Sequence, residues 1–194
     1  KLTTLNMGLA KDIVNENKKI LLLSLGLFFM SVVGVFLLNT NTLIVGPQIV
    51  DTDIYTNAED VLEEGIDYKA VIRTEYGNIE VDLFEQEAPN AVNSFLFLAG
   101  RDFYEGLTFH KVIPNFVIQA GDQVGDGTGD PGYTLELDNN ELEVNEYTMC
   151  MANASQFFIV PKGADTAQLQ DYPVVGRLIS GFVVVDAIEK VATD

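Results

Sequence analysis

Short apolar segments separated by turn residues fill the C-terminal two thirds of the chain, and this pattern constrains the fold most. Ile79, Val81 and Leu83 alternate with acidic residues, which is typical of a strand with one buried face. Helical spacing of apolar residues is clear in two stretches of this part, residues 92–99 and 184–191. Many short strands with only two helices predict a mainly β fold, closed into an antiparallel barrel.

The net charge of the 194-residue chain is −18, and it is unevenly distributed. Residues 1–50 hold four Lys against two acidic residues, a net of +2, whereas residues 51–194 hold seven Lys or Arg against 27 Asp or Glu, a net of −20. Affinity for nucleic acid rests largely on Lys and Arg that neutralise phosphates, so we expect no nucleic-acid partner. The acidity favours basic partners instead.

An apolar run without a charge, Ile20–Leu38, spans 19 residues near the N-terminus. As a helix it would be about 28 Å long, close to the roughly 30 Å core of a bilayer. A cleaved signal peptide is the alternative, but its apolar region is normally about 7–15 residues long and ends at a small-residue cleavage site. No clear site of that kind follows Leu38. We therefore expect a single transmembrane helix over residues 20–38, with membrane lipid as a partner.

The orientation of this span follows from the basic residues beside it. Lys11, Lys18 and Lys19 precede the span, and the next basic residue is Lys69. By the positive-inside rule, residues 1–19 form a cytoplasmic segment. The protein is then a single-pass membrane protein whose C-terminal domain lies on the extracytoplasmic side, whether periplasmic, extracellular or lumenal.

Residues 39–67 have the composition of an acidic linker between the span and the domain. Thr56 and Glu59 have the spacing of a helix capping box, and Gly65 can end a helix. We therefore predict a short helix over residues 57–64 within the linker.

Three motifs follow one another in the C-terminal domain. Phe109–Asp122 reads FHKVIPNFVIQAGD, Met151–Ala154 reads MANA, and Ser155–Ile159 reads SQFFI. In this order they resemble the cyclophilins, which are peptidyl-prolyl cis-trans isomerases, and the resemblance extends over residues 68–194. It implies a closed eight-stranded antiparallel barrel with a helix covering each end. It also implies an enzyme that acts on proline-containing polypeptides and assists protein folding.

Isomerisation of a prolyl peptide bond makes particular demands on a site. Rotation faces a barrier of about 18–20 kcal/mol because twisting breaks amide resonance, and uncatalysed exchange takes roughly tens to hundreds of seconds. Catalysis needs an apolar pocket for the proline ring, an anchored flanking backbone and a donor placed where the twisted nitrogen regains its lone pair. The reaction requires no nucleophile, metal or cofactor, and we expect none.

The resemblance assigns roles to individual residues. Lys111 and Gln119 take the catalytic positions. Substrate binding is assigned to Phe116, Val117, Ala152, Asn153, Gln156, Phe158 and Tyr172. The apolar pocket would comprise Phe116, Val117 and Phe158, and the polar side chains and the backbone would hold the substrate chain. For the two phenylalanines, simple packing inside the barrel is the alternative role.

Four departures from the family pattern bear on activity. Lys111 stands where the family has an arginine. The flexible ammonium group of a lysine therefore replaces the rigid, planar guanidinium group of an arginine. The chain has no tryptophan, although one often lines the family's pocket. Tyr172 falls near the family's usual histidine, and the loop between Ala154 and Ser155 is short. We therefore predict a weakened isomerase; the alternative is a non-catalytic accessory subunit of a larger membrane complex.

Other chemical signals in the chain are weak. The glycine-rich segment Gly125–Asp130 lacks the ending of a phosphate-binding P-loop and the ligand spacing of an EF-hand, so we interpret it as a flexible loop. His110 is the only histidine, which excludes a multi-histidine metal site. Cys150 is the only cysteine and lies in an apolar run, as expected of a small buried side chain.

Overall fold

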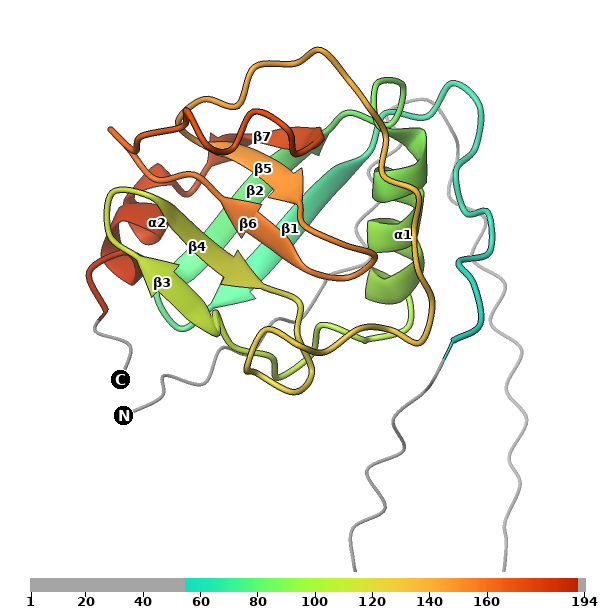
Figure 1. Ribbon diagram of the computed structural model, residues 1–194, viewed down its shortest axis with the longest axis horizontal. Helices are drawn as coiled ribbons and strands as arrows, with labels where there is room; N and C mark the ends of the chain where they lie inside the picture. The colour runs from blue at the N-terminus through green and yellow to red at the C-terminus, as the bar shows by residue number, and fades with distance from the viewer. Residues whose placement is uncertain (1–54, 192–194) are drawn as a thin grey trace, which may run out of the picture. The chain divides into compact units, whose positions relative to one another are not determined.

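The computed structural model describes residues 55–191, which form one antiparallel sheet and two helices (Figure 1). The elements are β1 (Lys69–Thr74), β2 (Gly77–Leu83), α1 (Pro89–Ala99), β3 (Lys111–Ile113), β4 (Val117–Ala120), β5 (Thr148–Met151), β6 (Phe157–Ile159), β7 (Val174–Ser180) and α2 (Phe182–Ile188). The strands are ordered β1-β2-β7-β5-β6-β4-β3. The predicted mainly β fold with two helices is therefore confirmed.

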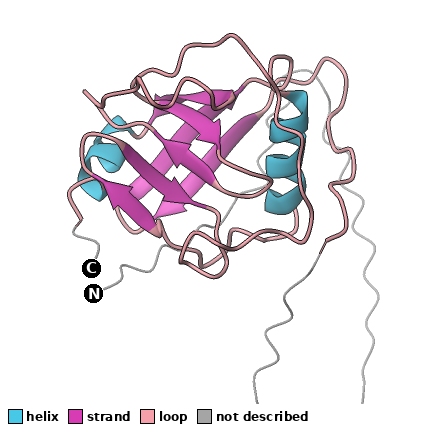
Figure 2. Cartoon of the chain, viewed as in Figure 1, coloured by secondary structure: helices cyan, strands magenta, loops and turns pink. Residues whose placement is uncertain are grey.

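The sheet is curled but does not close. Its edge strands, β1 and β3, are not neighbours in the strand order, and the described residues supply seven strands. The expected closed eight-stranded barrel is therefore wrong for this part of the chain. Residues 121–147, between β4 and β5, form loops and turns (Figure 2). Aspartate side chains in this segment accept hydrogen bonds from backbone N–H groups, which competes with pairing in a ladder.

One of these aspartates stabilises the start of α1 from a distance. The helix begins with Pro89, whose missing N–H costs nothing at this position. The next two backbone N–H groups, of Asn90 and Ala91, donate to the two carboxylate oxygens of Asp138 at 3.2 and 2.8 Å. A negative charge here also complements the helix dipole. This contact fixes the long β4–β5 segment against α1.

The main core lies between the sheet and both helices, which cover different parts of it (Figure 2). Its aromatic centre is Phe157 on β6, which is fully buried. The ring of Phe157 meets Phe95 of α1 at 5.6 Å and Tyr104 at 5.7 Å, both edge-on. The Tyr104 hydroxyl donates to the carbonyl oxygen of Ser155 at 3.0 Å. Burial holds the pKa of Tyr104 well above its ordinary value, so this hydroxyl stays a donor.

A second, smaller apolar cluster lies on the other face of the sheet. Successive side chains of a strand point to opposite faces of the sheet. Phe157 therefore packs in the main core, and Phe158 packs in the second cluster. The buried members of this outer cluster are Val117, Val144, Cys150, Phe158, Val160, Leu169 and Val174. Phe116 and Ala152 pack against it while partly exposed. Most of the predicted substrate-binding side chains therefore belong to this face.

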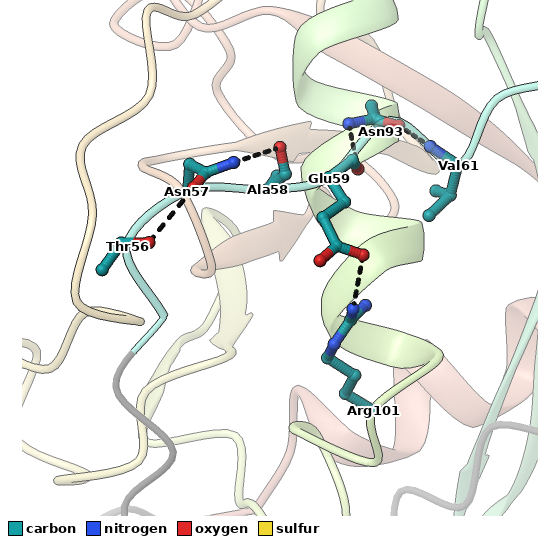
Figure 3. A network of polar contacts seen from close by, with 7 residues as sticks. All are labelled: Thr56, Asn57, Ala58, Glu59, Val61, Asn93 and Arg101. Carbon is teal, nitrogen blue, oxygen red and sulfur yellow. Dashed lines mark hydrogen bonds and ion pairs between the residues drawn. The ribbon is translucent and has the colours of Figure 1, made fainter.

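The chain before β1 differs from the predicted short helix. Residues 55–66, here called the N-terminal strap, run without regular secondary structure beside α1 (Figure 3). Thr56 donates its hydroxyl to the side chain of Asn57 rather than capping a helix, and Glu59 pairs with Arg101 at 2.8 Å. Both side chains of the predicted capping box are thus used elsewhere, Thr56 within the strap and Glu59 on Arg101 just beyond α1.

Residues 1–54 and 192–194 lie outside the described part of the chain. They include the predicted cytoplasmic segment, the transmembrane helix over residues 20–38 and most of the acidic linker. Within residues 55–191, neither helix combines the length and the apolar character needed to cross a bilayer.

Candidate active site

Strand register brings three of the predicted residues into one row. Lys111 on β3 lies opposite Gln119 on β4, and Gln119 lies opposite Phe158 on β6. Directly opposed residues of paired strands share one face of a sheet, so these side chains are neighbours on the outer face. Lys111 is exposed, Gln119 is partly buried and Phe158 is 2% exposed. The row therefore leads from a cation at the solvent edge to an aromatic ring in an apolar setting.

Two further aromatic residues belong to the same face of the sheet as Phe158. The Tyr172 ring meets it edge-on at 5.1 Å and an interplanar angle of 88°, while Tyr172 itself stays 37% exposed. Phe116 packs against the same outer cluster, as does Val117. Phe158 is buried in the outer cluster and Phe116 packs against that cluster, so neither ring belongs to the main core. A packing role in the outer cluster and a substrate-binding role both stay predictions for these two rings.

Phe116 is presented by the tight turn between β3 and β4. Its N–H donates to the carbonyl oxygen of Ile113 at 3.1 Å. Asn115, just before it, has a φ of 57°, a left-handed conformation that asparagine tolerates better than most residues. The Asn115 N–H donates to the carboxylate of Glu189, just beyond α2, at 2.6 Å. These two hydrogen bonds fix the turn, which holds the Phe116 side chain against the outer cluster.

A pair of glutamines joins this row to the glycine-rich loop. The Gln119 side-chain amide donates to the side-chain oxygen of Gln156 at 2.8 Å. The amide of Gln156, which is 2% exposed, donates in turn to the carbonyl oxygens of Gly127 and Gly129 at 3.1 and 2.8 Å. Gln156 is therefore a positioning residue that orients Gln119. Its predicted contact with the substrate remains a prediction.

The glycine-rich loop is more ordered than the sequence indicated. Buried Asp122 accepts hydrogen bonds from the N–H groups of Val124 and Gly127. At Gly129 an added Cβ would collide with the Asp122 carboxylate, so only glycine fits there. The sequence analysis missed Asp122 as a supporting residue. Its place at the end of the motif Phe109–Asp122, three residues before the glycine-rich segment that begins at Gly125, was the available signal.

The segment Ala152–Gln156 forms a tight turn at the end of the row. The side-chain oxygen of Asn153 accepts from the N–H groups of Ser155 and Gln156 at 3.0 and 2.7 Å. The Ala152 N–H donates to the Gln156 carbonyl oxygen at 2.8 Å. The Asn153 N–H also donates to the Gln156 carbonyl oxygen, at 3.4 Å, so the turn uses both the side-chain oxygen and the backbone N–H of this residue. The turn closes the short loop noted between Ala154 and Ser155.

An open groove of about 770 Å³ begins at this turn. Ala152, Asn153 and Ala154 line it, and residues 128–137 supply much of the remaining lining. The structure thus places the predicted backbone-binding residues beside a hollow large enough for a stretch of polypeptide. Thr56 of the N-terminal strap also lines it, which the sequence analysis did not foresee.

Cys150 lies next to Phe158 in the same sheet and is fully buried. Burial raises the pKa of its thiol to about 12, so it is neutral at ordinary pH. A neutral, inaccessible thiol is a poor nucleophile, which fits the packing role assigned from the sequence. Within residues 55–191, no group of three or more His, Cys, Asp or Glu side chains is arranged to hold a metal ion.

His110 precedes Lys111, and its buried ring nitrogens have no hydrogen-bond partner among the described residues. Burial lowers the pKa of His110; Asp122 acts against this shift and Lys111 adds to it. The unfolded chain therefore binds a proton at His110 more readily than the folded chain does. Stability should fall as the pH drops below about 6.5, the ordinary histidine value.

We expect the variant His110→Gln to lose this part of the pH dependence. Urea unfolding midpoints of the wild type and the variant, measured between pH 7.5 and pH 5 in about half-unit steps, check it. The wild-type midpoint should decline more steeply on acidification than that of the variant. Parallel curves would show that His110 titrates equally in both states.

The sequence of residues 69–194 matches the family described as cyclophilin type peptidyl-prolyl cis-trans isomerase/CLD. A peptidyl-prolyl cis-trans isomerase of Helicobacter pylori is 39% identical over 132 residues, which cover 62% of this chain and 80% of the relative. A protein of the same name from Synechococcus elongatus is 43% identical over 97 residues, which cover 47% of this chain and 67% of the relative.

A solved structure agrees with these relatives. The crystal structure of a cyclophilin type peptidyl-prolyl cis-trans isomerase of Cryptosporidium parvum, determined in the presence of the dipeptide Ala-Pro, superposes with a TM-score of 0.56 at 31% identity. The match covers 66% of this chain and 88% of that chain. The family match spans well over half of the chain, and the fold and the ordered motifs agree with it, so the chain belongs to the cyclophilin-type peptidyl-prolyl cis-trans isomerases.

Proposed function

We propose that this protein is a peptidyl-prolyl cis-trans isomerase that is tethered to a membrane and acts on proline-containing polypeptides outside the cytoplasm. The observation that carries the activity is the row formed by Lys111, Gln119 and Phe158 across three paired strands. It sets a cation and an amide next to an apolar surface. These are the groups that rotation about a prolyl bond requires.

Each part of the site has a task in the proposed reaction. The proline ring settles against Phe116 and Phe158, with the Tyr172 ring beside them. The backbone of Asn153 holds the chain next to the proline. As the amide twists, its nitrogen loses conjugation and becomes an acceptor, and Lys111 stabilises it from the exposed edge. Gln119, oriented by Gln156, fixes the substrate carbonyl or the donor geometry.

The lysine sets the expected level of activity. Its ammonium group is a flexible point charge, while the arginine of the family offers a rigid fork of donors. Losing one well-placed donor to a transition state typically costs about 10²–10³ in rate. Lys111 still donates, so we propose an activity that is reduced by less than this range.

The test is acceleration of the isomerisation of succinyl-Ala-Ala-Pro-Phe p-nitroanilide by the full chain in mild detergent. We expect a rate above the uncatalysed exchange at micromolar protein, and loss of that rate in Phe116→Ala. Substitution of exposed Tyr76, which lies in the β1–β2 turn, by Ala serves as the control that keeps the activity. Absence of any acceleration by the wild type would refute the proposed activity.

A second function, docking in a larger membrane complex, is supported by an apolar surface near the start of α2. Ile179, Phe182 and Val183 are 45%, 39% and 78% exposed. Contiguous exposed apolar side chains often mark contacts with other proteins. The two functions are compatible, because this surface does not include the residues of the catalytic row.

Membrane fractions test the tether and the docking together. We expect the chain to stay in the membrane pellet after an alkaline wash and, if it docks, to migrate in mild detergent as a particle much larger than its 21.3 kDa. Val183→Glu should release a smaller particle without removing the chain from the membrane. Release of the wild type by the wash would refute the tether, and a wild-type particle of monomer size would refute docking.

A further inference from the structure

The N-terminal strap is held against α1 by one asparagine. The Asn93 side-chain oxygen accepts from the N–H of Val61 at 2.7 Å, and its amide donates to the carbonyl oxygen of Glu59 at 3.0 Å (Figure 3). The Asn93 side chain therefore both donates to and accepts from the strap backbone. A residue of a neighbouring strand would make the same two hydrogen bonds with its backbone N–H and carbonyl groups. A segment held by two such hydrogen bonds has a defined position beside the helix.

Arg101, just beyond α1, fixes the start of the strap. Its guanidinium group pairs with Glu59 at 2.8 Å and lies 3.8 Å from the centre of the Phe97 ring and 5.9 Å from that of Tyr55. The Tyr55 and Phe97 rings meet edge-on at 5.4 Å. An arginine stacked on aromatic rings while it pairs with a carboxylate keeps a planar geometry that lysine cannot reproduce.

This anchored segment reaches the groove beside the active site. The Tyr55 N–H donates to the carbonyl oxygen of Pro131 at 2.9 Å, which ties the strap to the segment that forms much of the groove. Thr56, the next residue, lines the groove together with Ala152–Ala154. The Thr56 side chain is exposed, so it faces whatever occupies the hollow.

We infer that the strap is a wall of the substrate-binding groove and that Thr56 helps to select the residues that flank the proline. The occupant is the substrate polypeptide itself, because the groove is lined by Ala152 and Asn153, the residues proposed to hold the chain next to the proline. This inference rests on the proposed isomerase function. It makes Thr56 a specificity-determining residue and Arg101 a positioning residue.

The direct test is a variant that places a large side chain of the strap in the groove. In Thr56→Trp a large side chain occupies the hollow, and the control Asn57→Trp adds the same bulk at an exposed neighbour that does not line it. Isomerisation of a decapeptide with a central proline, measured on the full chain by NMR exchange spectroscopy, gives KM and kcat. We expect Thr56→Trp to raise KM about tenfold with kcat changed by less than about twofold, the sign of lost uniform binding.

A second variant loosens the strap without adding bulk. Arg101→Gln removes the ion pair and the stacking, and we expect KM for the decapeptide to rise about threefold or more while kcat stays within about twofold. Arg101→Lys restores the ion pair alone and should restore part of the affinity. Hydrogen exchange at the Tyr55 N–H should be faster in Arg101→Gln, in parallel with the change in KM.

The outcomes separate this inference from the proposed function. If the wild type isomerises the decapeptide but KM in both Thr56→Trp and Arg101→Gln stays within about twofold of its value, the inference fails and the isomerase stands. An equal effect of Asn57→Trp and Thr56→Trp would also overturn it. If the wild type neither binds nor isomerises the decapeptide, the proposed function fails and the inference with it.

Discussion

Replacing Lys111 with alanine is expected to lower kcat/KM by about 100-fold or more, the usual cost of removing a donor to the transition state. Lys111 is the exposed end of the row that continues through Gln119 to Phe158, so no apolar packing is lost with its charge. The effect should fall mainly on kcat, because the donor acts on the twisted amide. Protease-coupled assays of the full chain give both parameters.

Two further variants make this result specific. Lys69→Ala removes an exposed lysine at the opposite edge of the same sheet and should leave the rate unchanged. Lys111→Arg restores the planar donor of the family and should raise the rate by about tenfold, the equivalent of one charge-assisted hydrogen bond of about 1.5 kcal/mol. Equal rates for the wild type and Lys111→Ala would contradict the assigned role.

The substitution Phe157→Ala is expected to destabilise the fold by about 3–5 kcal/mol, as large-to-small changes of buried aromatic residues do. The ring is fully buried and touches Phe95 and Tyr104, so its removal leaves a cavity between β6 and α1. For a domain of this size the melting temperature should fall by roughly 10–20 °C. Thermal unfolding followed by near-ultraviolet circular dichroism measures the shift.

The matched control keeps most of the volume. Phe157→Leu fills much of the same space and should cost only about 1–2 kcal/mol. Phe182→Ala removes a ring that is 39% exposed and meets only Tyr147 among the described ring pairs, so its cost should be near 1 kcal/mol. If Phe157→Ala were no worse than Phe182→Ala, the core assigned to this side of the sheet would be wrong.

The adjacent phenylalanines show how far the sequence alone could lead. The motif Ser155–Ile159 identified both phenylalanines as family residues, and in the structure strand alternation sends the two rings to opposite faces. The mainly β class and the two helices followed from periodicity. Closure of the sheet did not, because pairing between strands distant in sequence depends on backbone groups that a pattern does not reveal.

The site itself was predicted unevenly. The assignment of Lys111, Gln119 and Phe158 to one site followed from a motif match, and the strand register of the structure places the three residues in one row. The support of Gln119 by Gln156 and by the carbonyl groups of the glycine loop was not predicted. Those contacts join residues about 30 positions apart, and no local pattern distinguishes a pinned glycine loop from a free one.

The helix predicted within the N-terminal strap is absent because contacts with distant residues decide the conformation there. Thr56 and Glu59 have the spacing of a capping box, yet they belong to a segment without regular secondary structure. The deciding partners, Asn93 and Arg101, lie more than 30 residues further on. Side-chain contacts of this kind override the weak preference of a short segment for a helix, since such a segment gains little from helix formation alone.

Binding of the dipeptide Ala-Pro, followed through isotope-labelled phenylalanine rings of the full chain, tests the outer-face site most directly. The site predicts saturable shifts of the Phe116 and Phe158 ring signals, and none for Phe157, which belongs to the opposite face of the same strand as Phe158. Phe116→Ala should remove the shift at Phe158. Saturable binding that leaves Phe116 and Phe158 unchanged would contradict the placement of the proline site.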